Sequence, residues 1–385
     1  MRILVFDYGF CNFHNLISLV EDGHRVYVIS THNFAPKRFF NSLGIKILDE
    51  GIAIRDSKIL EWIDISDIDI VIMTNPRRLN LRREIESKGI KVIGLTDQSA
   101  QLEINKFFVR QEVEKLGINV PKLLETPEFP CVFKPREMIP NKIRQTDVAQ
   151  ICLTKEDYPK VGDYDYFIEE YIPDNIETNV AYAMSGGKWS IMHTQQVLGE
   201  DLAKMAGNFF HWTKTVSFAK LSEENEKLAL DNAETFLNWS SQFGGEYVGQ
   251  ITGLVKDGKW YFCENNVRPE QTNSLPYFIS GNEWLDGMMN NPSIIGDGFP
   301  NDVHKMIVQP NEPDSVYPFH LHVEYGVSIP CGLDILGGEY RVCRSMRGRA
   351  KDNRIGLIIC DREIPQGFIE EFKKSSEFSI SHCFI

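Results

Sequence analysis

The 385-residue sequence predicts a protein of mixed α/β and α+β class, built in three regions. Strand-like and helix-like patterns alternate through the first hundred residues, which is typical of a parallel sheet. After about residue 120 the strands follow one another through short turn signals, which favours antiparallel pairing. The last part of the chain is again rich in strand patterns. We therefore expect a small doubly wound parallel sheet, then a central α+β domain, then a β-rich C-terminal part.

The N-terminal region consists of repeated strand and helix patterns. Five short apolar runs are the predicted strands: Arg2–Phe6, Arg25–Ile29, Ile45–Leu48, Asp67–Met73 and Ile90–Gly94. Three helix patterns each end close to a glycine, a common helix terminator: Leu16–Glu21, Pro36–Leu43 and Leu79–Lys88. The turn after the first strand, Asp7–Asn12, has one glycine where a dinucleotide-binding fingerprint needs three. A nicotinamide-binding site is therefore not expected.

The central region begins with an amphipathic helix pattern over Ser99–Leu116, which stops at Gly117. A second helix, Glu223–Gln242, is opened by Ser222 and has acidic residues in its first turn. Six strands are predicted around these helices: Cys131–Lys134, Tyr166–Tyr171, Asn179–Met184, Trp189–His193, Gly249–Val255 and Trp260–Glu264. Three more are predicted near the C-terminus: Phe319–Tyr325, Tyr340–Arg344 and Ile355–Cys360.

The composition bears on which binding partners and which cellular environment are expected. The formal net charge of −13 leaves no general basic field to hold nucleic-acid backbones, so nonspecific binding to nucleic acid is not expected. No leader pattern and no apolar run long enough to cross a bilayer is present, so we expect a cytoplasmic protein without a membrane partner. The eight cysteines include no CxxC pair, and we expect reduced thiols.

A Glu-x-Asn pair lies at a strand end within the predicted hairpin Gly249–Thr272. Glu264 and Asn266 are two residues apart, so both side chains leave the same face of the strand. A carboxylate and an amide oxygen are hard donors that suit Mg²⁺. A polar strand end on the surface is the alternative interpretation.

An apolar strand that ends in acidic residues precedes this hairpin. Glu169 and Glu170 close the strand, and Ile172 and Glu177 follow in the turn before the next predicted strand. Such a turn can offer main-chain groups to an adenine edge and a carboxylate to ribose hydroxyls. Solvated acidic residues are the alternative interpretation.

Two lysines could neutralise phosphates. Lys106 lies on the predicted helix that begins the central region, and Lys134 ends an apolar strand. A compact ammonium at a strand end is a common phosphate ligand. Neither lysine alone decides the question.

The order of these features resembles the ATP-grasp superfamily, and within it most resembles phosphoribosylamine-glycine ligase. The segments that carry the resemblance are Asp97–Lys106, Gly117–Pro121, Glu264–Arg268 and Pro269–Thr272, and biotin carboxylase offers a stretch similar to the last two. The resemblance covers residues 1 to about 280 in order. It implies a pre-ATP-grasp domain at 1–98, an ATP-grasp domain at 99–290 with a lid at about 122–190, and a β-rich region at 291–385.

The resemblance also implies roles for single residues. Lys106 and Lys134 would contact ATP phosphates. Glu169 would belong to the nucleotide pocket, main-chain groups of Glu170 and Ile172 would hold adenine, and Glu177 would hold the ribose. Glu264 and Asn266 would bind Mg²⁺. Arg268 would face the acyl phosphate or its carboxylate.

The sequence departs from the family pattern at two places. The family's glycine-rich lid corresponds to Pro135–Gln145, which contains no glycine, and we hypothesise that Lys142 and Arg144 replace backbone amides with side-chain charge. Thr252 stands where many relatives have an acidic metal ligand, with Gln250 as the nearest polar alternative.

The function that the resemblance implies is an ATP-dependent carboxylate-amine ligase that works through an acyl phosphate. Glycine or another amino acid joined to a phosphoribosylamine-like or nucleotide amine, as in purine biosynthesis, is the first expectation for its small-molecule substrates. Two alternatives remain open: transfer of an amino acid onto a modified nucleotide or base, and a catalytically degenerate ATP-binding sensor or scaffold. A monomer or a homodimer is expected.

Overall fold

The computed structural model describes most of the chain up to residue 268 and four strands beyond it. The described segments are 1–6, 22–30, 44–50, 54–73, 78–137, 150–157, 165–198, 217–219, 221–268, 304–310, 340–343, 356–360 and 378–383, with residues 16, 19, 20 and 76. The predicted helix Pro36–Leu43, the predicted strand Phe319–Tyr325 and the turn Asp7–Asn12 lie outside the described residues. Within the described part, no helix is long and apolar enough to cross a membrane.

The N-terminal sheet is parallel and doubly wound, as predicted. Its strands are β1 (Arg2–Phe6), β2 (Arg25–Ser30), β3 (Ile45–Glu50), β4 (Ile70–Met73) and β5 (Lys91–Gly94), in the order β3-β2-β1-β4-β5. The central strand β1 is apolar because both faces of such a sheet are covered: residues 3–6 are fully buried. Among the described residues, the helix α3 (Asp56–Ser66) connects β3 to β4, and the helix α4 (Leu79–Ser87) connects β4 to β5.

The helix α3 was missed by the sequence analysis. Its buried residues Ile59, Leu60 and Ile63 recur at the spacing of a helix face, which was the available signal.

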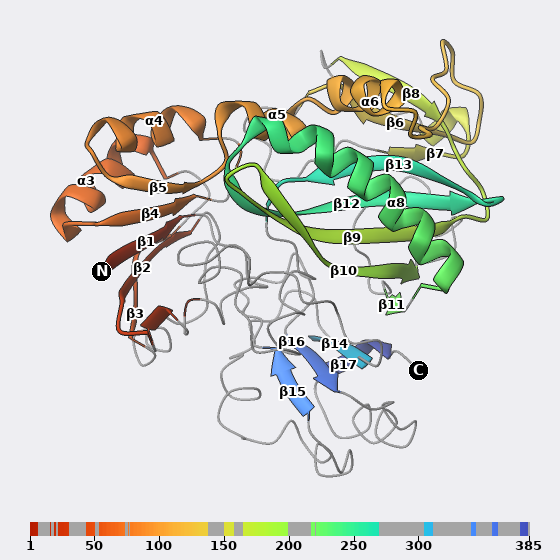
Figure 1. The fold of residues 1–385 in the computed structure, drawn as a ribbon. Coiled ribbons are helices and arrows are strands. Elements are labelled where there is room, and N and C mark those ends of the chain that lie inside the picture. The colour runs from red at the N-terminus through yellow and green to blue at the C-terminus, as the bar shows by residue number, and fades with distance from the viewer. Residues whose placement is uncertain are drawn as a thin grey trace.

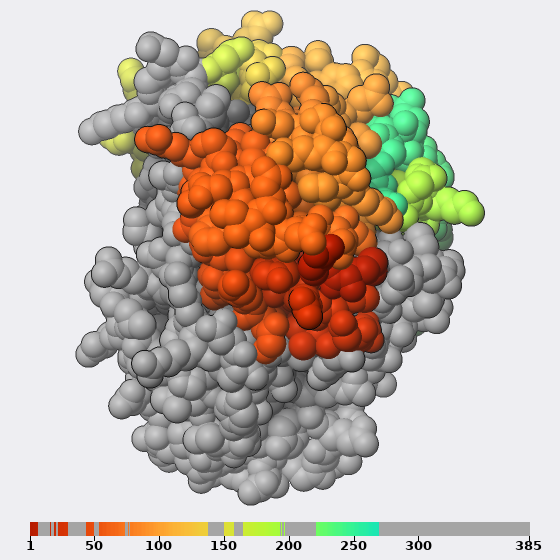
Figure 2. Space-filling model, turned by 90° about the vertical axis from the view of Figure 1, so that its left-hand side faces the viewer, coloured from red at the N-terminus to blue at the C-terminus, as the bar shows by residue number. Residues whose placement is uncertain are grey.

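Figure 2 shows the face on which the N-terminal residues, red to orange, border the lighter orange residues that follow them.

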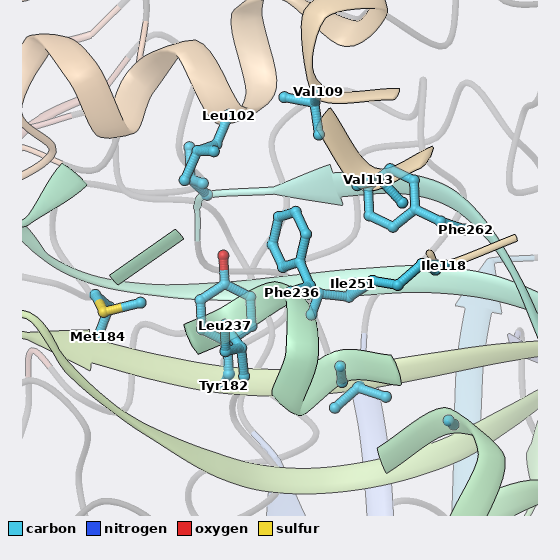
Figure 3. Close-up of a cluster of buried hydrophobic side chains, with 14 of the residues drawn as sticks. Leu102, Val109, Val113, Ile118, Tyr182, Met184, Phe236, Leu237, Ile251 and Phe262 are labelled. Carbon is cyan, nitrogen blue, oxygen red and sulfur yellow. The ribbon is translucent and has the colours of Figure 1, made fainter. Parts of the chain in front are cut away.

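The central sheet is antiparallel and packs one face against a long helix. Its strands are β9 (Ile176–Ser185), β10 (Lys188–Leu198), β11 (Ser217–Ala219), β12 (Glu246–Lys256) and β13 (Lys259–Asn266), in the order β11-β10-β9-β12-β13. The helix α8 (Glu223–Ser240) runs across the sheet in Figure 1. Figure 3 shows Phe236 and Leu237 of α8 among side chains from β9, β12 and β13, where they form the main core.

A three-stranded sheet lies beyond the edge strand β13 (Figure 1). It contains β6 (Cys131–Pro135), β7 (Gln150–Cys152) and β8 (Tyr166–Glu170), with β6 in the middle, and a short 3-10 turn, Lys155–Asp157, follows β7. A four-stranded antiparallel sheet near the C-terminus contains β14 (His304–Pro310), β15 (Tyr340–Cys343), β16 (Gly356–Cys360) and β17 (Phe378–Cys383). The predicted fold class is confirmed, whereas the domain boundaries stay a prediction.

The single helix predicted over Ser99–Leu116 is wrong, because two helices occupy this stretch. They are α5 (Asp97–Ile104) and α6 (Lys106–Lys115). Asn105 separates them with a non-helical conformation (φ −105°, ψ 81°), and its side chain accepts a hydrogen bond from the Phe108 amide at 2.9 Å. Asparagine competes with the helix for backbone donors and is a good N-cap. The break makes Lys106 the first residue of α6.

Replacing Asn105 with alanine should lower the free energy of unfolding by about 1 kcal/mol, because the Phe108 amide loses its acceptor. Asn105→Ser should recover most of the loss, since serine is also a good cap. Urea unfolding of the three proteins measures the difference. Equal destabilisation by alanine and serine would show that the cap is not what matters here.

Candidate functional site

A β-bulge decides which side chains of β13 face the site. Thr252 of β12 is opposite Glu264, but the next residue, Gly253, is opposite Phe262, so Cys263 is an extra residue in β13. In a regular strand Phe262 and Glu264 would share a face. The extra residue turns Glu264 to the opposite face, while Phe262 stays in the core against α8.

The face opposite α8 collects polar side chains from three strands. Glu264 is in register with Thr252, and Thr252 with Asn179 of β9, so the three lie in one row. The Thr252 hydroxyl donates to Asn179 Oδ1 at 2.9 Å, which confirms that these two side chains meet. Asn266 lies opposite Gln250 on the same face. The sequence prediction that Glu264 and Asn266 leave the same face agrees with this geometry.

Both oxygens of the Glu264 carboxylate have partners within the chain. Oε2 is paired with the Lys106 ammonium at 2.5 Å, and Oε1 accepts from Asn266 Nδ2 at 3.3 Å. Burial alone would raise the pKa of Glu264, but the positive charges of Lys106 and Lys134 and the Asn266 hydrogen bond together lower it. Glu264 is therefore an anion, and its oxygens are hard donors.

Lys134 reaches the same place from β6. Its ammonium donates to the Cys263 carbonyl oxygen at 3.1 Å and is paired with Glu169 Oε2 at 2.7 Å. Burial works to lower the pKa of Lys134, yet the Glu169 carboxylate and other nearby acids raise it overall. The contact with the bulged residue ties the three-stranded sheet to the edge of the central sheet.

Glu169 is enclosed by two cations. Arg110 of α6 donates through Nε to Glu169 Oε1 at 2.8 Å and through Nη2 to the Pro121 carbonyl oxygen at 2.6 Å. Glu169 and Arg110 are 2% and 4% exposed, so both charges are compensated inside the protein. The side chain of Glu169 thus holds Lys134, and its expected contact with a nucleotide stays a prediction.

The predicted adenine and ribose positions lie at the end of β8 and the start of β9. The Glu170 amide donates to the Lys122 carbonyl oxygen at 2.9 Å, and the Ile172 carbonyl oxygen accepts from Asn175 Nδ2 at 2.6 Å. Glu177, two residues before Asn179 on the polar face, has its pKa raised to about 7 by burial and by the charge of Glu264. Glu177 and Glu264 are therefore electrostatic neighbours.

Arg268 is oriented by an acid that the sequence analysis missed. Glu103 of α5 is 2% exposed, accepts from the Val267 amide at 2.9 Å and forms an ion pair with Arg268. Arg268 Nη1 also donates to Asn266 Oδ1 at 3.2 Å. A carboxylate three residues after the buried Ala100 was the signal that could have identified Glu103. Lys142, Arg144 and Pro269–Thr272 lie outside the described residues.

The donor set suits a magnesium ion shared with phosphates. Among the residues that the structure describes, no group of three or more His, Cys, Asp or Glu forms a metal cage. Glu264 and Asn266 supply a carboxylate and an amide oxygen, side by side at a strand end. Mg²⁺ prefers oxygen ligands and commonly keeps positions for water and substrate phosphates, so two protein donors are sufficient.

Removal of Arg110 tests the enclosed ion pairs. Arg110→Met should lower the free energy of unfolding by about 3–5 kcal/mol, because Glu169 then keeps a buried charge with one cation fewer. Lys115→Met, which breaks an exposed pair on the same helix, should cost about 1 kcal/mol or less. Urea unfolding at neutral pH separates the two; similar losses would contradict the burial argument.

Glu177 predicts a pH dependence of stability. Its pKa of about 7 in the folded protein exceeds the ordinary 4.5, so the folded state binds more protons than the unfolded chain between these values. The Glu177 contribution therefore weakens folding as the pH rises from 4.5 to 7. Glu177→Gln should reduce this loss in urea unfolding across the window. Glu234→Gln on α8 controls for losing one carboxylate, and an unchanged slope in Glu177→Gln would refute the assignment.

Of the comparisons with known proteins, only the comparison with solved structures finds proteins similar to this chain. No protein-family model and no curated protein matches the chain. Biotin carboxylase from Campylobacter jejuni, solved as a β-γ-ATP complex, has a TM-score of 0.63 at 13% identity, covering 99% of this chain and 92% of that one. N5-carboxyaminoimidazole ribonucleotide synthetase from Thermotoga maritima has a TM-score of 0.62 at 15% identity, covering 98% and 99%.

A third similar structure was solved with nucleotide and bicarbonate. The biotin carboxylase domain dimer of 2-oxoglutarate carboxylase from Hydrogenobacter thermophilus, with MgADP, ADP and bicarbonate, has a TM-score of 0.65 at 13% identity, covering 100% of this chain and 91% of that one. Such identities support a shared fold and do not assign an activity. The structural neighbours are ATP-grasp proteins, and they do not single out phosphoribosylamine-glycine ligase. The chain has the fold of these ATP-grasp enzymes.

Proposed function

We propose that this chain is an ATP-dependent ligase that activates a carboxylate as an acyl phosphate and transfers it to an amine. The observation that carries the proposal is the meeting of Lys106, Lys134, Glu264 and Asn266 at the bulged end of β13. These four side chains come from three separate elements. Their charges match those of a triphosphate and a magnesium ion, and the fold is shared with proteins solved with ATP-type ligands.

The geometry supports the proposed roles of four residues. Lys106 and Lys134 bind phosphate oxygens, since both ammonium groups lie beside the bulge. Glu264 and Asn266 hold Mg²⁺, which when bound would neutralise charge on the phosphate oxygens. The roles of Glu169, Glu170 and Ile172 in the nucleotide pocket, of Glu177 toward the ribose, and of Arg268 and Lys142 toward the acyl group are proposed from the resemblance.

The proposed reaction has two steps, phosphoryl transfer to the carboxylate and then transfer of the acyl group to the amine. A substrate carboxylate oxygen attacks the γ-phosphorus, the bond from that phosphorus to the β–γ bridging oxygen breaks, and ADP leaves. The amine nitrogen then attacks the acyl carbon, the bond from that carbon to the phosphate oxygen breaks, and inorganic phosphate leaves while the amine proton passes to solvent. The ammonium groups of Lys106 and Lys134 offset the negative charge that the phosphoryl group carries during transfer.

Several small molecules are candidate substrates for this reaction. An amino acid such as glycine, joined to a phosphoribosylamine-like or nucleotide amine in purine biosynthesis, follows from the sequence resemblance. Bicarbonate is a second acid to test, because it is bound in the 2-oxoglutarate carboxylase domain. Both are small molecules, and the protein is proposed to act as a monomer or a homodimer.

Turnover of ATP tests the proposal. With ATP, Mg²⁺, bicarbonate and pools of amino acids and nucleotide amines, the protein should release ADP and phosphate. Glu264→Gln should lower the rate at least about a hundredfold, since the proposed metal loses its anionic ligand. The exposed Glu234→Gln is the matched control. Stabilisation by ATP with no turnover in any pool would favour the sensor alternative instead.

A further inference from the structure

Lys106, which is proposed to bind phosphate, and Glu264, which is proposed to bind a metal cation, form an ion pair with each other. The Lys106 ammonium is paired with Glu264 Oε2 at 2.5 Å, and the side chain of Lys106 is 11% exposed. The other oxygen of Glu264 accepts from Asn266 Nδ2. The carboxylate proposed to hold a divalent cation is therefore already neutralised by a cation of the chain itself.

This arrangement disfavours metal binding by the protein alone. A divalent cation placed on Glu264 would lie close to the Lys106 ammonium, and like charges at such separation repel. The cation would also have to replace a charge-assisted hydrogen bond from Lys106 to Glu264, whose side chains are 11% and 34% exposed. Nucleotide phosphates reverse both effects, because they neutralise the ammonium and add oxygen ligands for the metal.

We propose that Lys106 is a built-in counter-ion of Glu264, which keeps divalent cations from this carboxylate until nucleotide phosphates engage the ammonium group. The inference rests on the proposed function and adds a property to it: metal and nucleotide bind with positive coupling. By linkage, each ligand raises the affinity of the other by the same factor.

Lys134 provides an internal comparison. Its ammonium is paired with Glu169 at 2.7 Å, and Glu169 is also held by Arg110. Lys134 thus has a counter-ion of its own, Glu169, although its positive charge also acts on Glu264 and lowers the pKa of that carboxyl. Removal of Lys134 leaves the pair between Lys106 and Glu264 in place, so its effect on metal binding should be smaller.

Removal of the Lys106 ammonium should change the affinities for metal and for nucleotide in opposite directions. Without the Lys106 ammonium, Glu264 is exposed to cations, and metal binding should strengthen. The same change removes a phosphate ligand, so nucleotide binding should weaken. A residue that merely maintained the fold would weaken both, and for this reason the sign of the metal effect is decisive.

The first experiment measures Mn²⁺ binding, with Mn²⁺ replacing Mg²⁺ because both favour oxygen ligands. The electron paramagnetic resonance signal of unbound Mn²⁺ gives the affinity of the full chain without nucleotide. Lys106→Gln and Lys106→Met should each bind Mn²⁺ about tenfold more tightly than the original protein. Lys134→Gln should change the affinity less, and the double variant Lys106→Gln/Glu264→Gln should lose the gain.

The second experiment measures ADP binding by calorimetry with and without saturating Mg²⁺. In the original protein the metal should raise ADP affinity, and in Lys106→Gln that enhancement should shrink while ADP affinity itself falls about tenfold. The proposal is overturned if folded Lys106 variants bind Mn²⁺ no more tightly than the original. In that case the ligase proposal still stands if ADP binds and ATP is turned over. Tight Mn²⁺ binding by the variants without any ADP binding would support the counter-ion and remove the nucleotide site.

Discussion

The extra residue at the end of β13 is the constraint on which the site depends. Phe262 must remain in the core with Phe236 of α8, and the two rings stack with centroids 5.4 Å apart. A regular strand would carry Glu264 into the same core, where an ionised carboxylate is very costly. One inserted residue, Cys263, satisfies both demands, because it keeps the aromatic ring inside and turns the acid outward. Asn265 then points inward, where Tyr182 donates to its Oδ1 at 2.9 Å and fixes the end of the strand.

Around this strand end, each described cation that is proposed to act in binding or chemistry is paired with an acid from another part of the chain. Lys134 is held by Glu169 of β8, and Arg268 by Glu103 of α5. The acids Glu169 and Glu103 are almost fully buried and contact main-chain or side-chain donors besides the cation. Such pairs contribute little net stability, but they fix where a charge sits. The site is therefore assembled by ion pairs that connect α5, α6, β6, β8 and β13, and its geometry depends on all of them.

The parts of the fold that follow from local pattern could be predicted. Apolar runs such as Arg2–Phe6 fixed the parallel sheet, and the Asp257–Gly258 turn, with both φ values positive, fixed the hairpin that carries Glu264. The parts that depend on distant partners could not. The helix break at Asn105 required weighing a cap against an otherwise continuous apolar face, and the bulge at Cys263 exists because β12 and α8 constrain its neighbours. Glu103 and Arg110 read as ordinary charges on helices until their buried partners are known, and Lys142 lies outside the described residues.

The polar row beside the bulge has a closely balanced charge. Thr252, which stands where the family pattern led us to expect an acid, donates to Asn179 instead of adding a negative charge. Within the described row of Glu264, Thr252 and Asn179, Glu264 is thus the one acid, and the Lys106 ammonium offsets it. A second carboxylate at position 252 would give the row a net negative charge and attract a cation without help. With threonine there, the row itself carries no surplus negative charge, which fits the proposal that a metal binds together with nucleotide phosphates.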